Sequence, residues 1–292
     1  MRDSRLDLPE LRRARGIAFS VSVAECYGCQ DSAAAVAACE AAHDITLLPQ
    51  TGTPLELLKL WRRRFNGAVA SEPARVSLYE RFPDLRSVFD SSLWSLLKPD
   101  LLPTRAEELA QSVRVNGKQL AGFSPKSLAI LSGCPHWQRL APLLAILRSK
   151  SSTFLMQRCW LRKSFAAFCC LMCVRPGHRK LAVPLWKAIH SLEAQGKLGD
   201  IAFWPADAGW FERLLMKQIK LGDRLISNGW VDGWDDECLL WLWSLAEPQH
   251  TGLVEALLST EVFPHGMKPS AVTIEVQRAL VKRARVVVTL SM

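Results

Sequence analysis

The chain has 292 residues, 49% hydrophobic and 22% charged, so it can bury a sizeable core, and wholesale disorder is excluded. Its formal net charge of +9 favours anionic partners: nucleic acid, an acidic membrane surface or an acidic protein. The nine cysteines are odd in number and no secretory signal precedes them, which argues against a disulfide framework and for a reducing, cytoplasmic compartment.

Residues 1–50 are predicted to form a small N-terminal module. Within it, Ile17–Val23 alternates large apolar residues with alanine and serine, a period of two that predicts a half-buried strand. An alanine-rich helix is expected between Asp31 and His43, because Asp31 or Ser32 can cap it. A stretch punctuated by proline and glycine, residues 47–53, then leads into a helical core domain over residues 51–292.

The N-terminal module also carries a candidate metal site with the spacing C-x2-C-x9-C-x3-H. Its first two cysteines fall in a turn, and its last two residues are four apart on one face of the expected helix. Thiolates and imidazole in that arrangement suit structural zinc with tetrahedral geometry. The alternative is that the third cysteine is only a small buried residue of an alanine-rich helix. The candidate ligands are Cys26, Cys29, Cys39 and His43.

The core domain is predicted to be mainly α, an irregular multi-helix bundle. Two capping boxes, Thr53-Pro-Leu-Glu56 and Thr104-Arg-Ala-Glu107, mark helix starts, and the pairs Asn66-Gly67 and Asn116-Gly117 are expected helix stops. Further helices are predicted at about 76–82, 86–97, 136–148, 181–194, 206–227, 235–246, 252–259 and 270–285.

A central helix within Ser151–Lys180 is expected to organise this bundle. Its middle, Phe165–Val174, has ten residues without a polar side chain, so other helices should cover it on every face. A bilayer span needs about 20 apolar residues, and this run is too short for one. The β-branched tail Val286–Leu290 is predicted to be a strand, which pairs with the strand at Ile17–Val23 or joins it in a small sheet.

Basic residues flank the central apolar run and close the last predicted helix. Clustered Lys and Arg bind phosphates with release of counterions, so these residues predict contact with the backbone of nucleic acid. The competing interpretation is a charged face that is only solvated. The basic set is Arg158, Arg162, Lys163, Arg175, Arg179, Lys180, Lys282, Arg283 and Arg285.

Tryptophan is unusually frequent, with eleven residues against two tyrosines. Large aromatic side chains are enriched at contact hot spots, which indicates a partner-binding surface in the C-terminal half. The alternative is that they fill a helical core. The residues proposed for partner contact are Trp230, Trp234, Trp241 and Trp243.

Catalytic motifs are lacking: the sequence has no G-x-x-x-x-G-K-[ST], H-E-x-x-H or G-x-S-x-G. A helix-turn-helix over residues 106–131 would need a turn of ten residues, far longer than usual. Acidic side chains that could hold magnesium lie at a helix start, where capping of the helix is the preferred explanation for them. They are Asp232, Asp235, Asp236 and Glu237, and a second thiol and imidazole set in an apolar run is Cys170, Cys173 and His178.

The sequence thus predicts a non-catalytic, basic, mainly α protein with a small β element from its N- and C-terminal segments. The first functional hypothesis is a subunit of a larger assembly that contacts nucleic-acid backbone and does not enter a membrane. The alternative is a protein–protein adaptor that docks a partner through its Trp-rich C-terminal half, with the charge serving solubility. A metal-dependent enzyme that uses the acidic cluster is a third hypothesis.

Overall fold

The computed structural model describes residues 8–29, 32–44, 54–120, 135–259, 268–283 and 288–290. Its fold is mainly α, which confirms the fold class predicted from the sequence. Helices α1 to α7 are Leu8–Cys26, Ala33–Asp44, Pro54–Phe65, Glu72–Arg81, Leu85–Phe89, Leu93–Leu96 and Pro103–Gln111. Helices α9 to α15 are Trp137–Arg148, Leu155–Leu171, Ala182–Ala194, Ala208–Ser227, Asp236–Leu245, Thr251–Leu258 and Ser270–Arg283. The 3-10 turns η1, η2 and η3 are Ser152–Phe154, Pro176–Leu181 and Pro248–His250.

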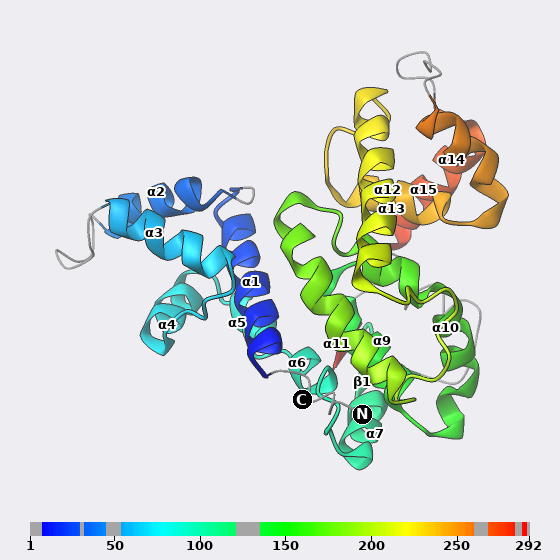
Figure 1. Ribbon diagram of the computed structural model, residues 1–292, viewed down its shortest axis with the longest axis horizontal. Coiled ribbons are helices and arrows are strands. Elements are labelled where there is room, and N and C mark those ends of the chain that lie inside the picture. Colours follow the sequence, from blue (N-terminus) through cyan, green and yellow to red (C-terminus); the bar gives the residue numbers. More distant parts are fainter. Residues whose placement is uncertain are drawn as a thin grey trace.

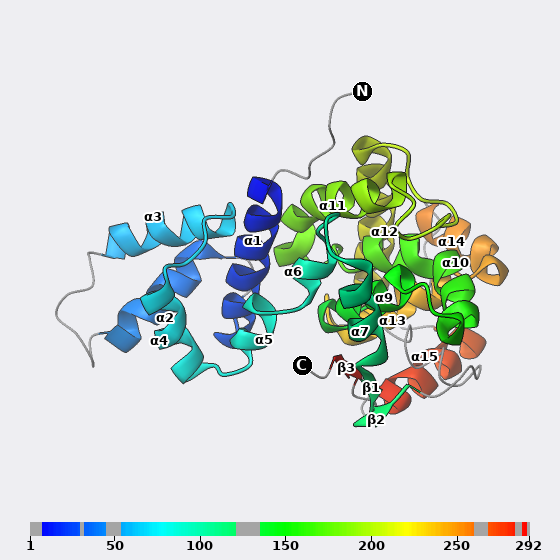
Figure 2. The same cartoon turned by 90° about the horizontal axis from the view of Figure 1, so that it is seen from below.

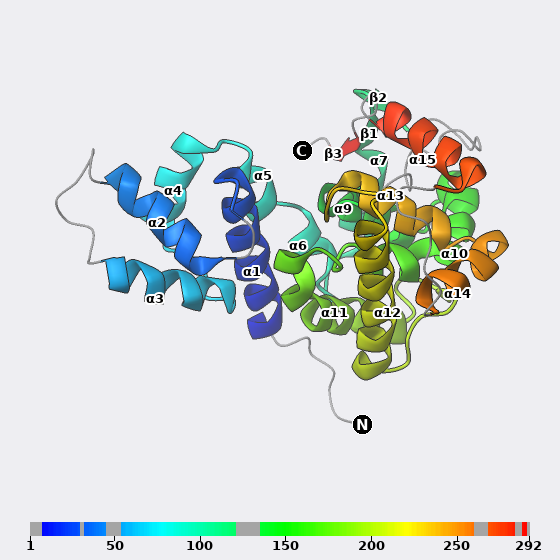
Figure 3. The ribbon, with the colours of Figure 1, turned by 90° about the horizontal axis from the view of Figure 1, so that it is seen from above.

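Helix α1 stands between two groups of helices. Helices α2 to α4 lie on one side of it, and α7 to α15 form a larger body on the other (Figure 1 and Figure 3). Helix α1 packs on α3 in the first group, on α11 and η2 in the second, and on the short helix α5. Helices α2 and α3 pack on each other across the predicted boundary at residue 50, where Trp61 Nε1 donates to Glu40 Oε2 at 2.7 Å.

The segment Ile17–Val23 is helical, so the prediction of an N-terminal strand is wrong. It belongs to α1, whose middle is buried on nearly every face: Ala18 and Ser20 are as inaccessible as Ile17 and Val21. Close approach explains part of this burial, because a Cβ at Gly16 would lie only 2.6 Å from the carbonyl oxygen of Gly67. The alternation of large and small residues in this segment therefore reflects how closely its neighbours pack against it. It does not mark one buried and one exposed face of a strand.

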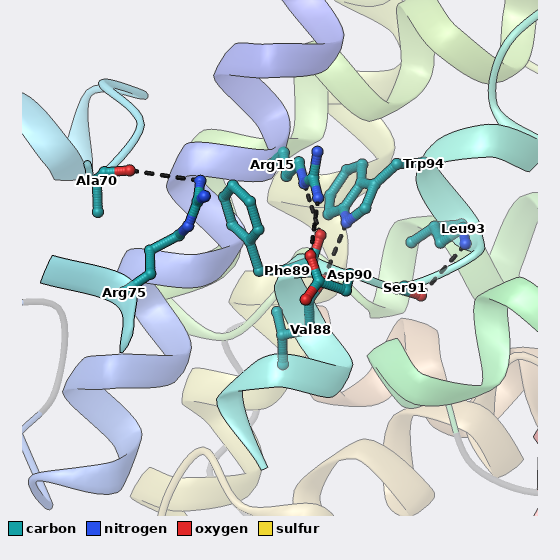
Figure 4. A network of polar contacts seen from close by, with 9 residues as sticks. All are labelled: Arg15, Ala70, Arg75, Val88, Phe89, Asp90, Ser91, Leu93 and Trp94. Atoms are coloured by element: carbon teal, nitrogen blue, oxygen red, sulfur yellow. Dashed lines mark hydrogen bonds and ion pairs between the residues drawn. The ribbon is translucent and has the colours of Figure 1, made fainter. Parts of the chain in front are cut away.

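An arginine and aromatic cluster joins α1 to α5 and α4 (Figure 4). The ring of Phe89 lies between two guanidinium groups, those of Arg15 at 3.8 Å and Arg75 at 4.1 Å from its centroid. Arg15 Nε also donates to the backbone oxygen of Phe89 at 2.6 Å, and its Nη2 faces Asp90 Oδ1 at 3.3 Å. Both arginines thus hold the N-terminal helices together.

The predicted central helix is confirmed. It is α10, and the run Phe165–Val174 is buried apart from the half-buried Ala167. Helices α9, α11, α12 and α13 all pack against α10 (Figure 2). Helix α9 is buried to the same degree, because every residue from Arg139 to Arg148 is inaccessible. None of the helices in the described ranges is both long and apolar enough to cross a bilayer.

A small antiparallel sheet has the strand order β2-β1-β3, formed by Lys118–Gln119, Val113–Val115 and Val288–Leu290. The predicted C-terminal strand is therefore confirmed, but its partner is β1, with Val113 opposite Leu290, and not the N-terminal segment. The pair Asn116-Gly117 does not end a helix. Its φ angles of 51° and 73° make the tight turn between β1 and β2, and the preceding helix α7 ends at Gln111.

Candidate functional site

The structure brings together one pair from the predicted zinc site. Cys29 Sγ and Cys39 Sγ are 3.8 Å apart, at the end of α1 and on α2. Burial raises the pKa of the Cys29 thiol, and the neighbouring Cys39 raises it further. Within the described ranges no three His, Cys, Asp or Glu side chains gather closely enough to hold a metal, so Cys26 does not complete a site. The side chain of His43 lies outside the described residues, and the zinc site stays a prediction.

The second thiol set is part of the core. Burial raises the pKa of Cys170 to about 12 and that of Cys173 further still. Burial also lowers the pKa of His178 to about 4, with Arg175 and His136 adding to the shift. Metal binding requires thiolates, so these protonated thiols behave as small apolar residues.

The acidic residues at the start of α13 cap the helix or form ion pairs, as expected if they do not hold magnesium. Asp235 Oδ1 accepts a hydrogen bond from the backbone nitrogen of Cys238 at 2.9 Å and so caps α13. Asp236 forms an ion pair with Arg175, and Glu237 Oε1 lies 3.8 Å from Lys268 Nζ. The carboxylates therefore face different partners and do not converge on one cation.

Two of the four tryptophans proposed for partner contact are core residues. Trp230 and Trp241 are 0% exposed, and their ring centroids lie 5.3 Å apart. Trp243 is half-buried and packs edge-on against Phe168. Trp234 is half-buried and lies under the guanidinium of Arg179. These four side chains therefore do not form one exposed surface.

The basic residues around the central helix are used mostly inside the molecule. Arg158 is only 7% exposed and donates to the carbonyl oxygen of Ser151 at 2.7 Å. Arg162 Nε donates to the carbonyl oxygen of Leu198 at 3.0 Å. Lys163 is exposed, and no other described residue pairs with its side chain.

The second half of this basic set is also engaged. Besides the ion pair of Arg175, Arg179 Nε donates to the carbonyl oxygen of Val174 at 3.0 Å, and Lys180 Nζ lies 3.4 Å from Asn66 Oδ1. The side chains of Lys282 and Arg283 lie outside the described residues, as does the whole of Arg285. The predicted phosphate-binding collar is thus largely a set of internal contacts.

Helix α12 presents a different group of cations, which the sequence analysis did not single out. Arg213, Lys217, Lys220 and Arg224 are exposed, and their spacing of four, three and four residues places them on one stripe of the helix. In the described part of the chain, the charged side chains of these four residues form no hydrogen bond or ion pair. We call these residues the basic stripe.

The basic stripe lies on a well-supported helix. The opposite face of α12 is buried through residues such as Phe211, Leu215 and Ile219, and α12 packs against α10, α11, α13 and α14. Figure 3 shows α12 running across the near side of the larger body. At a rise of 1.5 Å per residue, the eleven steps from Arg213 to Arg224 extend the stripe over about 16 Å.

A pocket of about 320 Å³ lies where α1, α5, η2 and the start of α9 meet. Its walls include Cys26, Glu25 and His178. Burial raises the pKa of the Cys26 thiol, and Glu25 and Asp84 raise it further. The thiol and the imidazole of His178 are therefore both neutral, which is the opposite of the thiolate and imidazolium pair of an activated nucleophile.

Comparison with known proteins assigns no family. No family model matches this sequence, and no curated protein and no solved structure matches it significantly. The inferences that follow therefore rest on the geometry of this chain.

Proposed function

We propose that this protein is a non-catalytic, basic helical subunit of a larger assembly and that it contacts nucleic-acid backbone through the basic stripe of α12. The observation that carries the proposal is that four exposed cations without partners in the described part of the chain share one helix face. Cations left in water lose little hydration when they approach a phosphate, and they release the counterions condensed on the strand.

The length and the positive charge of the basic stripe suit an extended polyanion such as a nucleic-acid strand. Its length of about 16 Å corresponds to about five nucleotide steps of 3.4 Å. The acidic residues of α12 nearest to it, Glu212 and Asp223, lie about 100° around the helix from its centre and so do not interrupt it. A linear row of like charges on a rigid helix matches the regular charge of a strand better than scattered surface cations do.

The adaptor alternative has less support. Its surface was to be formed by four tryptophans, and Trp230 and Trp241 are enclosed in the core. Replacing them would remove large buried side chains and lower stability, whatever the protein binds.

The test is a pair of variants that remove the same amount of charge. The stripe variant carries Arg213→Gln, Lys217→Gln, Lys220→Gln and Arg224→Gln. The matched control replaces four exposed lysines scattered over the described surface, which are Lys59→Gln, Lys118→Gln, Lys150→Gln and Lys197→Gln. Affinity for a fluorescein-labelled oligonucleotide is measured by anisotropy from about 50 to 200 mM salt.

For the wild-type protein, log affinity should fall linearly with log salt concentration. On a single strand the slope changes by about 0.7 for each phosphate contact, so the stripe variant should lose up to about 3 units of slope. The control should stay close to wild type. An equal loss in both variants, or no binding by the wild-type protein at low salt, would show that the stripe is not a specific contact surface.

A further inference from the structure

Phe203 is the most exposed large apolar side chain in the described part of the chain, at 92%. Its backbone has φ of 57°, in the left-handed region that a bulky side chain rarely adopts. A phenylalanine that is both strained and solvated contributes nothing to the core. Strained residues of this kind persist only where the surrounding structure holds them in place.

The neighbours of Phe203 fix the loop that carries it. The backbone nitrogen of Ala202 donates to the carbonyl oxygen of Arg162 at 3.0 Å, on α10. On the other side, Trp204 stacks on Phe165, and its Nε1 lies 3.3 Å from His190 Nδ1. One residue further on, the carbonyl oxygen of Pro205 accepts a hydrogen bond from Trp186 at 3.1 Å. Phe203 is therefore held in position by a loop anchored before and after it.

This loop leads directly into the helix that carries the basic stripe. The ring of Trp204 lies 6.3 Å from that of Phe211, so the loop sits against the N-terminal part of α12. Asp207 caps α12 by accepting from the backbone nitrogen of Trp210 at 2.7 Å. The Trp210 side chain is 50% exposed and lies one turn before Arg213, on the same side of the helix. One exposed aromatic side chain, Trp210, thus lies at the N-terminal end of the stripe, and a second, Phe203, is on the loop that leads into the same helix.

We propose that the nucleic acid bound at the stripe is single-stranded, and that Phe203 and Trp210 stack on its bases while the stripe holds its phosphates. This inference rests on the function proposed above. Surfaces that bind single strands combine a row of cations with aromatic side chains, because every unpaired base offers a flat face for stacking. In a duplex those faces are covered by neighbouring base pairs, so exposed aromatic side chains gain nothing from it.

The experiment compares a labelled 12-nucleotide oligothymidine with a duplex of the same length. Phe203→Gly and Trp210→Ala should each weaken binding of the single strand by between about 5- and 150-fold, the range found for one stacked base. Binding of the duplex should not change, and the salt slope should stay that of wild type because no cation is removed. Thermal unfolding provides a folding check, since glycine relieves the positive φ of residue 203 and should not lower Tm.

Conservative replacements separate stacking from general hydrophobic contact. Phe203→Trp should keep the affinity for the single strand, whereas Phe203→Leu, apolar but not planar, should lose it. Full affinity in Phe203→Leu, together with displacement of the oligonucleotide by vesicles that contain phosphatidylserine, would identify a membrane-binding surface and overturn the inference.

Failure of this inference can be told apart from failure of the proposed function. If Phe203→Gly and Trp210→Ala bind the single strand as tightly as wild type while the stripe variant does not, stacking is refuted and backbone contact stands. If the stripe variant also binds normally, the contact surface itself is wrong, and the inference falls with it.

Discussion

Arg148 fastens the C-terminal end of α9 to the chain that connects α6 with α7. The side chain is 7% exposed, and its Nη1 donates to the carbonyl oxygens of Leu96 and Lys98, both at 2.6 Å. Nη2 adds a longer contact of 3.4 Å to the carbonyl oxygen of Leu101. Burial lowers the pKa of this arginine. Arg148→Met keeps an unbranched apolar side chain and removes every hydrogen-bond donor, so it isolates the contribution of these hydrogen bonds to the free energy of unfolding.

The expected loss of stability follows from the bonds and the burial. A hydrogen bond to a charged group contributes about 1.5–3 kcal/mol, so the two short bonds together contribute about 3–6 kcal/mol. The bond to Leu101 is long and adds little. Methionine avoids the cost of burying a charge, which places the net loss near the lower end, at about 3 kcal/mol. For a chain of this size that corresponds to a fall in Tm of about 6–12 °C.

Urea denaturation followed by circular dichroism measures this difference directly. The control is Arg105→Met, because Arg105 is exposed and its ion pair with Glu108 at 2.7 Å stays in water, where such pairs contribute about 0.5 kcal/mol or less. A loss below about 1 kcal/mol in Arg148→Met would mean that water replaces the guanidinium at the three carbonyls, and the reasoning from burial would be wrong.

Two further predictions concern stability in the larger body. A methyl group at Gly222 would overlap the ring of Trp234, so Gly222→Ala should lower the urea concentration at the midpoint of unfolding. The control is Gly252→Ala, where no atom lies within 4 Å of the added methyl group, and it should leave that midpoint unchanged or raise it. Equal effects of the two substitutions would contradict the packing argument. Because burial lowers the pKa of His178 from 6.5 to about 4, only the unfolded state binds this proton between those values. The free energy of unfolding should therefore fall as pH drops from about 6.5 to about 4, and His178→Gln should flatten that fall; an unchanged pH profile in the variant would refute the assignment.

Much of the helical framework could be predicted because its signals are local. Asp235 accepts from the backbone nitrogen of Cys238 and begins α13, and α9 begins shortly after Pro135, so both starts are readable in the sequence. The sequence around Ile17–Val23 could not by itself rule out a strand, because an alternation with period two is read as a strand with one exposed face. In the structure this segment is buried apart from the half-buried Ser22. The pair Asn116-Gly117 was ambiguous because Asn-Gly occurs both at the ends of helices and in the turns of β-hairpins. The strand β3, which pairs with β1 and so favours the hairpin, lies far away in the sequence.

The candidate site was harder to predict, because sequence does not distinguish a free cation from an internal one. Arg158 and Lys217 look alike in a list of basic residues, yet the first bonds to the carbonyl oxygen of Ser151 and the second faces solvent. The prediction of phosphate contact fell on the central helix because basic residues stand next to each other on both sides of it. The stripe on α12 has no such run, but its four, three, four spacing within the expected helix 206–227 is visible to a helical projection.

The three-stranded sheet has a consequence for how the chain is made. Strand β1 lies between β2 and β3, and the residues that pair with its second edge come about 170 positions after it. At a synthesis rate of about 5–20 residues per second, that edge waits about 10–35 seconds for its partner on the ribosome. During that interval β1 exposes unpaired backbone groups that a neighbouring nascent chain can bind. Newly made copies therefore expose this edge to mispairing until β3 emerges.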